Sequence, residues 1–257
     1  MCELLGFNFK KAINPNFSFS YFQQRSTNHK NGWGIAYYPD QSAQIIKEAI
    51  AAEHSEFAKL ISKSTIVKSN IIISHIRKNS RGDQSFSNTH PFERIFKKKH
   101  WIFAHNGTLD ESNLNPLNGY YPLGKTDSER AFCYLLGRLK SLQIKGESTS
   151  DFQQMELLLK SINQCGKFNV LFSDGKRLFA YHNEFTTENQ LYFTRRKAPF
   201  GNVTLKDDDY SINLDLVKDT DNEGVIIATS PITSDEEWHA LPKGCLKIFE
   251  HGQPIQF

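Results

Sequence analysis

Apolar residues along the chain fall into short runs that predict β-strands before and after two helices. The clearest run is 70–76, Asn-Ile-Ile-Ile-Ser-His-Ile, whose β-branched side chains predict a buried strand. Turns are expected at Pro39-Asp40 and at Asp174-Gly175, between neighbouring strands. The other predicted strands are 2–9, 33–38, 43–49, 101–104, 169–172, 178–181, 191–193, 225–228 and 246–249.

Two long helices are predicted in the middle of the chain. Thr126 is followed three residues later by Glu129, a spacing typical of a capping box, so we expect a helix from here to about Lys140. A second helix is expected over 151–164, and residues 53–62 have a helical pattern. Because the helices are grouped rather than alternating with strands, the order predicts sheets packed together with helices outside, not βαβ units.

Composition excludes several classes of protein. Of the 257 residues, 39% are hydrophobic and 12% aromatic, which is enough for a large core and argues against intrinsic disorder. The net charge of +3 is too small to indicate a nucleic-acid or membrane partner, and we interpret the lysines at 97–99 as a solvated loop. No apolar run reaches the roughly 18 residues of a membrane span.

The four cysteines indicate the cellular compartment. They stand at positions 2, 133, 165 and 245 without a CxxC pair, which excludes a disulfide scaffold and a zinc knuckle and suits a reducing compartment. The N-terminus lacks the basic and apolar regions of a signal peptide. We therefore expect a soluble cytoplasmic protein with no bound metal.

Cys2 is the first candidate for chemistry. Removal of Met1 would leave a residue that carries both a thiol nucleophile and an amine base, with reference pKa values of about 8.5 and about 7.7–8.0. Taken alone, Cys2 can equally be a small apolar residue at the start of a buried strand.

Three later motifs each allow a structural and a functional interpretation. Arg77 ends the strand at 70–76, where it can hold a carboxylate or simply face solvent. Asn106-Gly107 is typical of a type I′ hairpin turn, but an amide side chain beside a glycine N–H can also form an oxyanion hole. Asp127, at the first helical position, can stabilise the helix or accept hydrogen bonds from a substrate ammonium.

Together and in this order, these motifs resemble the class II glutamine amidotransferases, whose glutaminase domains are N-terminal-nucleophile hydrolases. The likeness is strongest to the YafJ-like branch. It implies an α+β fold, a four-layer αββα sandwich of two antiparallel sheets, in one domain over 1–257. The matching segments cover nearly the whole chain: 1–6, 29–35, 74–77, 88–92, 104–107, 126–129, 173–175, 194–201 and 227–231.

The resemblance also implies roles for individual residues. Cys2, freed of Met1, would attack the side-chain amide of glutamine, with its own amine as base, and form a γ-glutamyl thioester. The Asn106 side chain and the Gly107 N–H would bind the developing oxyanion.

The same resemblance implies a clamp for the substrate head group. Arg77 would hold the α-carboxylate with help from Ser80, and Asp127 would hold the α-ammonium. His29 and Asn31 would support the site from a neighbouring loop.

No organic cofactor is implied, and the substrate is expected to be a small molecule. Because the resemblance covers nearly all of the chain, no region is left for a synthase that would use the ammonia. An ammonia donor to an unknown partner protein therefore competes with an amidohydrolase of γ-glutamyl bonds in a larger substrate, such as a glutathione-like peptide. A third possibility is a catalytically silent module that binds glutamine or a partner.

Overall fold

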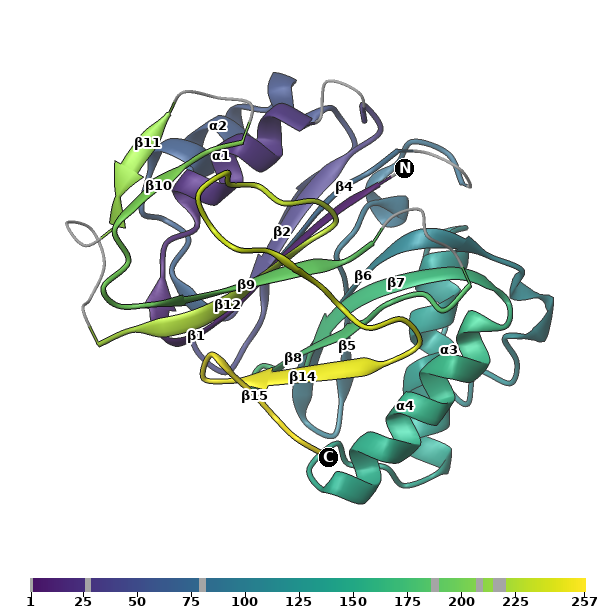
Figure 1. Ribbon diagram of the computed structural model, residues 1–257. Helices are drawn as coiled ribbons and strands as arrows, with labels where there is room; N and C mark the ends of the chain where they lie inside the picture. Colours follow the sequence, from purple (N-terminus) through teal and green to yellow (C-terminus); the bar gives the residue numbers. More distant parts are fainter. Residues whose placement is uncertain (1, 26–28, 79–81, 186–189, 207–209, 215–220) are drawn as a thin grey trace.

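The computed structural model describes residues 2–25, 29–78, 82–185, 190–206, 210–214 and 221–257, and two antiparallel sheets form its centre (Figure 1). The strands of the first sheet are β1 (Glu3–Ile13), β2 (Trp33–Tyr37), β3 (Gln44–Glu48), β4 (Ser69–Ile76), β9 (Tyr192–Lys197), β12 (Glu223–Ala228) and β13 (His239–Ala240). Their order in space is β13-β9-β12-β1-β4-β2-β3, so β1 lies in the middle. Every pair is antiparallel.

The second sheet faces the first and has the order β15-β14-β8-β7-β6-β5. Its strands are β5 (Phe92–Phe96), β6 (Lys99–Leu109), β7 (Gly166–Ser173), β8 (Arg177–Tyr181), β14 (Leu246–Glu250) and β15 (Gln253–Pro254). Two short strands, β10 (Asn202–Thr204) and β11 (Ser211–Asn213), form a separate pair beside the first sheet.

Helices cover both outer faces, which makes four layers (Figure 1). Helices α1 (Asn16–Gln24) and α2 (Glu56–Lys63) pack on the first sheet, and α3 (Asp127–Ser141) and α4 (Thr149–Asn163) pack on the second. In the described part of the chain, none of these helices is long and apolar enough to cross a membrane. The 3-10 turns are η2 (Ala52–His54), η3 (Phe86–Asn88) and η4 (Glu111–Asn113).

Strand β1 carries apolar side chains on both of its faces. Leu5, Phe7 and Phe9 point to the helix side, where they pack with α1 and α2. Leu4 points the other way and joins the core between the sheets. A strand with apolar side chains on both faces is stable only when both faces are covered. The predicted αββα sandwich of two antiparallel sheets is therefore confirmed.

The structure adds elements that the sequence pattern did not predict. In α1, Phe17, Phe19 and Tyr21 stand at every second position, a spacing typical of a strand, yet the segment is helical and buries all three rings. The edge strand β5 was also not predicted, because Glu93 and Arg94 interrupt its apolar residues. The strand predicted at 101–104 is longer and continues to Leu109.

The start of α3 confirms only half of the predicted capping box. The Thr126 hydroxyl accepts the Glu129 N–H at 3.2 Å, as expected for an N-cap. The Glu129 carboxylate, however, accepts from Arg94 at 2.6 Å and from the Gly124 N–H at 2.7 Å. It therefore fastens the loop before the helix to β5. A complete capping box occurs instead at α4, between Ser148 and Asp151.

Candidate active site

The side chains of Cys2, Arg77 and Asn106 are turned toward the space between the two sheets. Each is separated by an even number of residues from a core side chain on the same strand. Because side chains two residues apart in a strand point to the same face, all three point toward that space. The strands concerned are β1, β4 and β6, and the starting core residues are Leu4, Ile73 and Ala104.

Cys2 is held beside Arg77 by the pairing of β1 with β4. Glu3 pairs with Ile76, and the next step of the register brings Cys2 opposite Arg77. The Cys2 Sγ lies 3.3 Å from both the N–H and the carbonyl oxygen of Lys78. Burial raises the pKa of the Cys2 thiol above its usual value, against the opposing effect of the Lys78 backbone and the Arg77 charge. A neighbouring base would therefore be needed to generate the thiolate at neutral pH.

Side-chain contacts fix the first residues of β1. The Glu3 carboxylate forms an ion pair with Arg25, at 3.0 Å, just beyond the end of α1. The same carboxylate accepts a hydrogen bond from the Thr229 hydroxyl, which in turn accepts the Leu4 N–H at 3.3 Å. These contacts from the end of α1 and from the residue after β12 fix the position of Cys2 at the start of the central strand β1.

Asn106 and Gly107 lie within β6 and do not form a hairpin turn. Asn106 pairs with Asn169 and Gly107 with Phe168 of β7, so the hairpin interpretation is wrong. Asn106 is 2% exposed, and its Nδ2 group has no hydrogen-bond partner among the described residues. A buried donor without a partner costs about 1–3 kcal/mol, and an oxygen bound at this position would recover that energy.

The Gly107 N–H points away from β7, toward the side of Asp127. Asp110 donates its N–H to Cys165, next to the first residue of β7, whereas Leu109 donates its N–H to the Asp127 carboxylate at 2.7 Å. N–H groups two residues apart point to the same side of a strand, so Gly107 shares the direction of Leu109. The amide donor and the carboxylate thus lie along one edge of β6.

Asp127 and Arg77 also lie within electrostatic range of each other. Burial lowers the pKa of Arg77, and the negative charge of Asp127 is one of the groups that oppose this shift. Asp127 is 3% exposed and also accepts the Ser128 N–H at 2.9 Å. One buried carboxylate and one buried guanidinium therefore flank the strand ends, as a head-group clamp requires.

Two loops support Arg77. Its backbone pairs with the loop before β2, where the Asn31 N–H donates to Arg77 and Gly32 accepts from it. Its guanidinium donates to the Asp83 carbonyl at 3.0 Å and lies 3.4 Å from that of Gly82. The predicted supporting residue Asn31 is thus beside Arg77. His29 contacts the Arg25 carbonyl at 3.0 Å, and Ser80 lies outside the described residues.

A group of buried histidines behind the site was not predicted. The rings of His75 and His90 are 4.1 Å apart, and none of their four ring nitrogens forms a hydrogen bond of normal geometry with a described residue. Burial lowers the pKa of His75 to about 3 and that of His90 well below its usual value. His105, also buried, has a lowered pKa for the same reason. All three belong to the motifs quoted above, but their contact joins residues distant in sequence.

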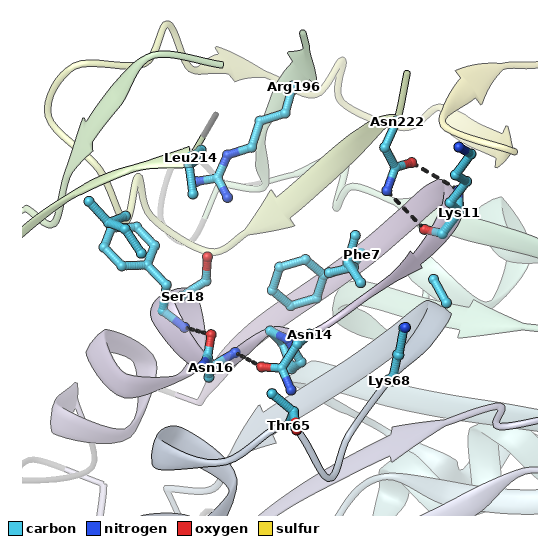
Figure 2. A pocket seen from close by; sticks show the side chains of 15 residues that line it. Phe7, Lys11, Asn14, Asn16, Ser18, Thr65, Lys68, Arg196, Leu214 and Asn222 are labelled. Atoms are coloured by element: carbon cyan, nitrogen blue, oxygen red, sulfur yellow. Dashed lines mark hydrogen bonds between the residues drawn. The ribbon is translucent and has the colours of Figure 1, made fainter. Parts of the chain in front are cut away.

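A separate pocket of about 640 Å³ lies at the other end of β1 (Figure 2). Figure 2 shows Arg196 and Leu214 on one side, Asn14 and Asn16 on the other, and Phe7 between them. None of the predicted site residues lines it. Among the described residues, no three His, Cys, Asp or Glu side chains are placed to hold a metal ion.

Comparisons with known proteins show the family of this chain. Residues 1–257 match the family model described as glutamine amidotransferases class-II. The putative glutamine amidotransferase YafJ of Escherichia coli is 34% identical over 260 residues, which cover 99% of this chain and 100% of that protein. Protein MJ1515 of Methanocaldococcus jannaschii is 46% identical over 255 residues, covering 99% of this chain and 71% of that protein.

A solved structure has the same fold over its full length. The crystal structure of a predicted glutamine amidotransferase from Pseudomonas aeruginosa has a TM-score of 0.73 and 28% identity, covering 100% of both chains. The resemblance drawn from the motifs is thus confirmed. This chain belongs to the class II glutamine amidotransferase family.

Proposed function

We propose that this protein hydrolyses the side-chain amide of glutamine to glutamate and ammonia through a γ-glutamyl thioester on Cys2. The observation that carries the proposal is the Asn106 Nδ2 group, a buried donor without a partner, at the strand ends that also hold Cys2. Such a donor is useful when the substrate oxygen becomes negative. Each donor of an oxyanion hole contributes roughly 2.7–4 kcal/mol to the transition state.

The chemistry starts with removal of Met1. The freed amine of Cys2, with a reference pKa of about 7.7–8.0, takes the thiol proton, directly or through a water. The sulfur then bonds to the amide carbon, and the oxyanion faces Asn106 and Gly107. The C–N bond breaks as nitrogen takes up a proton and leaves as ammonia. Water then attacks the thioester carbonyl, which releases glutamate and restores the thiol.

Arg77 and Asp127 select an α-amino acid by its two charges. Arg77 would pair with the α-carboxylate and Asp127 with the α-ammonium, so that the side-chain amide is directed at Cys2. Both residues are nearly completely buried, and at low dielectric a charge without its partner is strongly disfavoured. A substrate lacking either charge would lose the corresponding ion pair with the protein.

Replacing Arg77 with alanine should weaken substrate binding more than it slows the chemical step. Loss of two charge-assisted hydrogen bonds predicts an increase of about 10²-fold in the KM for glutamine. Steady-state kinetics of ammonia release measure this directly. Arg195→Ala is the matched control, because Arg195 is an exposed arginine of β9 whose guanidinium bonds Gln253. An unchanged KM in Arg77→Ala would show that the carboxylate is bound elsewhere.

Replacing Gly107 with alanine should damage both the fold and the reaction. An added Cβ would lie 1.9 Å from the Lys167 carbonyl oxygen, so β6 or β7 has to move. We expect a loss of about 1–3 kcal/mol in unfolding free energy and at least a tenfold lower kcat. Ile95→Ala, at a position of β5 that is 60% exposed, should change neither quantity. A Gly107→Ala protein with normal kcat would contradict the role of Gly107.

The decisive experiment combines intact mass with substrate comparison. Purified protein is incubated with a diazo-ketone analogue of glutamine, and ammonia release is measured from glutamine and from γ-glutamyl peptides. Loss of one methionine, one label on Cys2 and ammonia from free glutamine are the expected results. Faster cleavage of a γ-glutamyl peptide would instead select the amidohydrolase of larger substrates. Processed protein without label or turnover would favour a silent binding module.

A further inference from the structure

His105 lies between two partners on the helix side of β6. Its Nδ1 is 2.8 Å from the Ser128 hydroxyl, and its Nε2 is 3.0 Å from the Lys167 carbonyl oxygen. A carbonyl oxygen can only accept, so Nε2 carries the hydrogen and donates it to Lys167. Nδ1 then accepts the hydrogen of the Ser128 hydroxyl. Both ring nitrogens are therefore used, and they define one neutral tautomer.

The His105 ring also borders the place where a side chain of Gly107 would stand. A Cβ on Gly107 would lie 2.6 Å from His105 Nε2 and 1.9 Å from the Lys167 oxygen that accepts from it. The His105–Lys167 hydrogen bond thus closes the space over Gly107 on the helix side. Gly107 is consequently held between this hydrogen bond and the pairing of β6 with β7.

The partner of His105 Nδ1, the Ser128 hydroxyl, belongs to the residue next to Asp127. Ser128 directly follows Asp127 in the first turn of α3, and Asp127 accepts the Leu109 N–H at 2.7 Å. Two ties therefore join the end of β6 to the start of α3, one from His105 and one from Leu109. They stand on either side of Gly107 in the sequence.

We propose that His105 is a positioning residue that fixes the Gly107 N–H relative to Asp127, so that the oxyanion donor and the ammonium-binding carboxylate form one rigid unit. The proposal rests on the proposed glutaminase function for its kinetic consequence. Its geometric consequence is independent of activity, because it concerns where the Gly107 amide lies. Misplacement of reacting groups by about 1 Å can cost about 10²-fold in rate, so a small movement of Gly107 has a large effect.

The test combines kinetics with NMR of the full chain. His105→Phe retains a ring but loses both hydrogen bonds, and we expect the kcat for glutamine to fall at least tenfold. Reaction of Cys2 with iodoacetamide needs no oxyanion hole and should change by less than about twofold. The Gly107 amide resonance should shift. The matched control is His182→Phe, since His182 is equally buried, has a lowered pKa and its ring bonds only the Leu241 carbonyl among the described residues.

If the His105→Phe protein does not fold, two further variants test the proposal. Ser128→Ala removes one hydrogen bond with little change in volume and should lower kcat about threefold or more. His105→Gln offers an N–H to Lys167 and an oxygen to Ser128, so it should keep more activity than the phenylalanine variant. Nitrogen-15 shifts of the wild-type protein should show a neutral ring with its hydrogen on Nε2 from pH 6 to pH 8.

Two results would overturn the proposal. Equal losses of kcat and of Cys2 alkylation would indicate general disruption of the site, and unchanged kcat with an unmoved Gly107 resonance would show that His105 positions nothing. A wild-type protein that releases no ammonia from glutamine would reject the proposed function instead. The Gly107 resonance in the Ser128 and His105 variants would then still decide whether His105 positions that amide.

Discussion

Cys2→Ala should lose glutamine turnover by at least about 10³-fold while it keeps its fold. The sulfur is the proposed nucleophile, and the methyl side chain of alanine cannot form the thioester. Its side-chain hydrogen bonds are only those with the Lys78 backbone among the described residues, so its removal should change the melting temperature by less than about 4 °C. Ammonia release and circular dichroism measure the two effects.

The control for this prediction is another partly buried cysteine. Cys165 lies between α4 and β7, and Cys165→Ala should retain normal turnover. The protein must be checked by mass spectrometry, because a retained Met1 would block the amine of every variant alike. Turnover near the wild-type value in processed Cys2→Ala would exclude Cys2 as the nucleophile.

The protein should lose much of its stability between pH 6.5 and pH 5. In the folded state burial lowers the pKa of His75 to about 3 and that of His90 well below 6.5, whereas both titrate near 6.5 when unfolded. The unfolded state therefore binds more protons, and the stability present above pH 6.5 is lost as pH falls. For two histidines kept neutral the loss by pH 5 is about 4 kcal/mol, and His105 adds to it with the same sign.

Urea unfolding at pH 7.5, 6.5, 5.5 and 5.0 measures this loss. His90→Gln removes one of the titrating rings, so its stability should fall less steeply with pH, by about 1.4 kcal/mol per pH unit. The control His251→Gln affects a side chain that is 64% exposed and should keep the wild-type slope. The charged neighbours of His90, which are Lys47 and Arg77, are already cationic above this range. Equal slopes in the wild type and in His90→Gln would contradict the prediction.

The sequence was sufficient for the parts of the fold in which local pattern and tertiary packing agree. The β-branched run at 70–76 forms β4, and the helices expected near Thr126 and at 151–164 form α3 and α4. Where the two disagree, packing decides the outcome. The alternating aromatic residues of α1 are typical of a strand, but they become a helix that covers the first sheet. Asn106-Gly107 is typical of a turn, but pairing with β7 keeps it extended.

For the candidate site, too, the sequence predicts some of the residues but not all of their contacts. Cys2, Arg77, Asn106 and Asp127 each belong to a recognisable motif, and the strand alternation turns the side chains of the first three toward the space between the sheets. The contact between His75 and His90 could not be predicted, because it depends on where the loop before β5 crosses the first sheet. Nor could the ties from His105 to Ser128 and Lys167, since these partners come from α3 and β7.

The central place of β1 has a consequence for the order of events during synthesis. In β1, Leu5 pairs on one side with Ser74 and on the other with Ala228, 223 residues further along the chain. The first sheet therefore cannot close during synthesis before the segment up to Ala228 has been made, and long-range pairing of this kind is slow. Until then Cys2 is not enclosed between the sheets. An aminopeptidase acting on Met1 would have access to the start of β1 throughout that time.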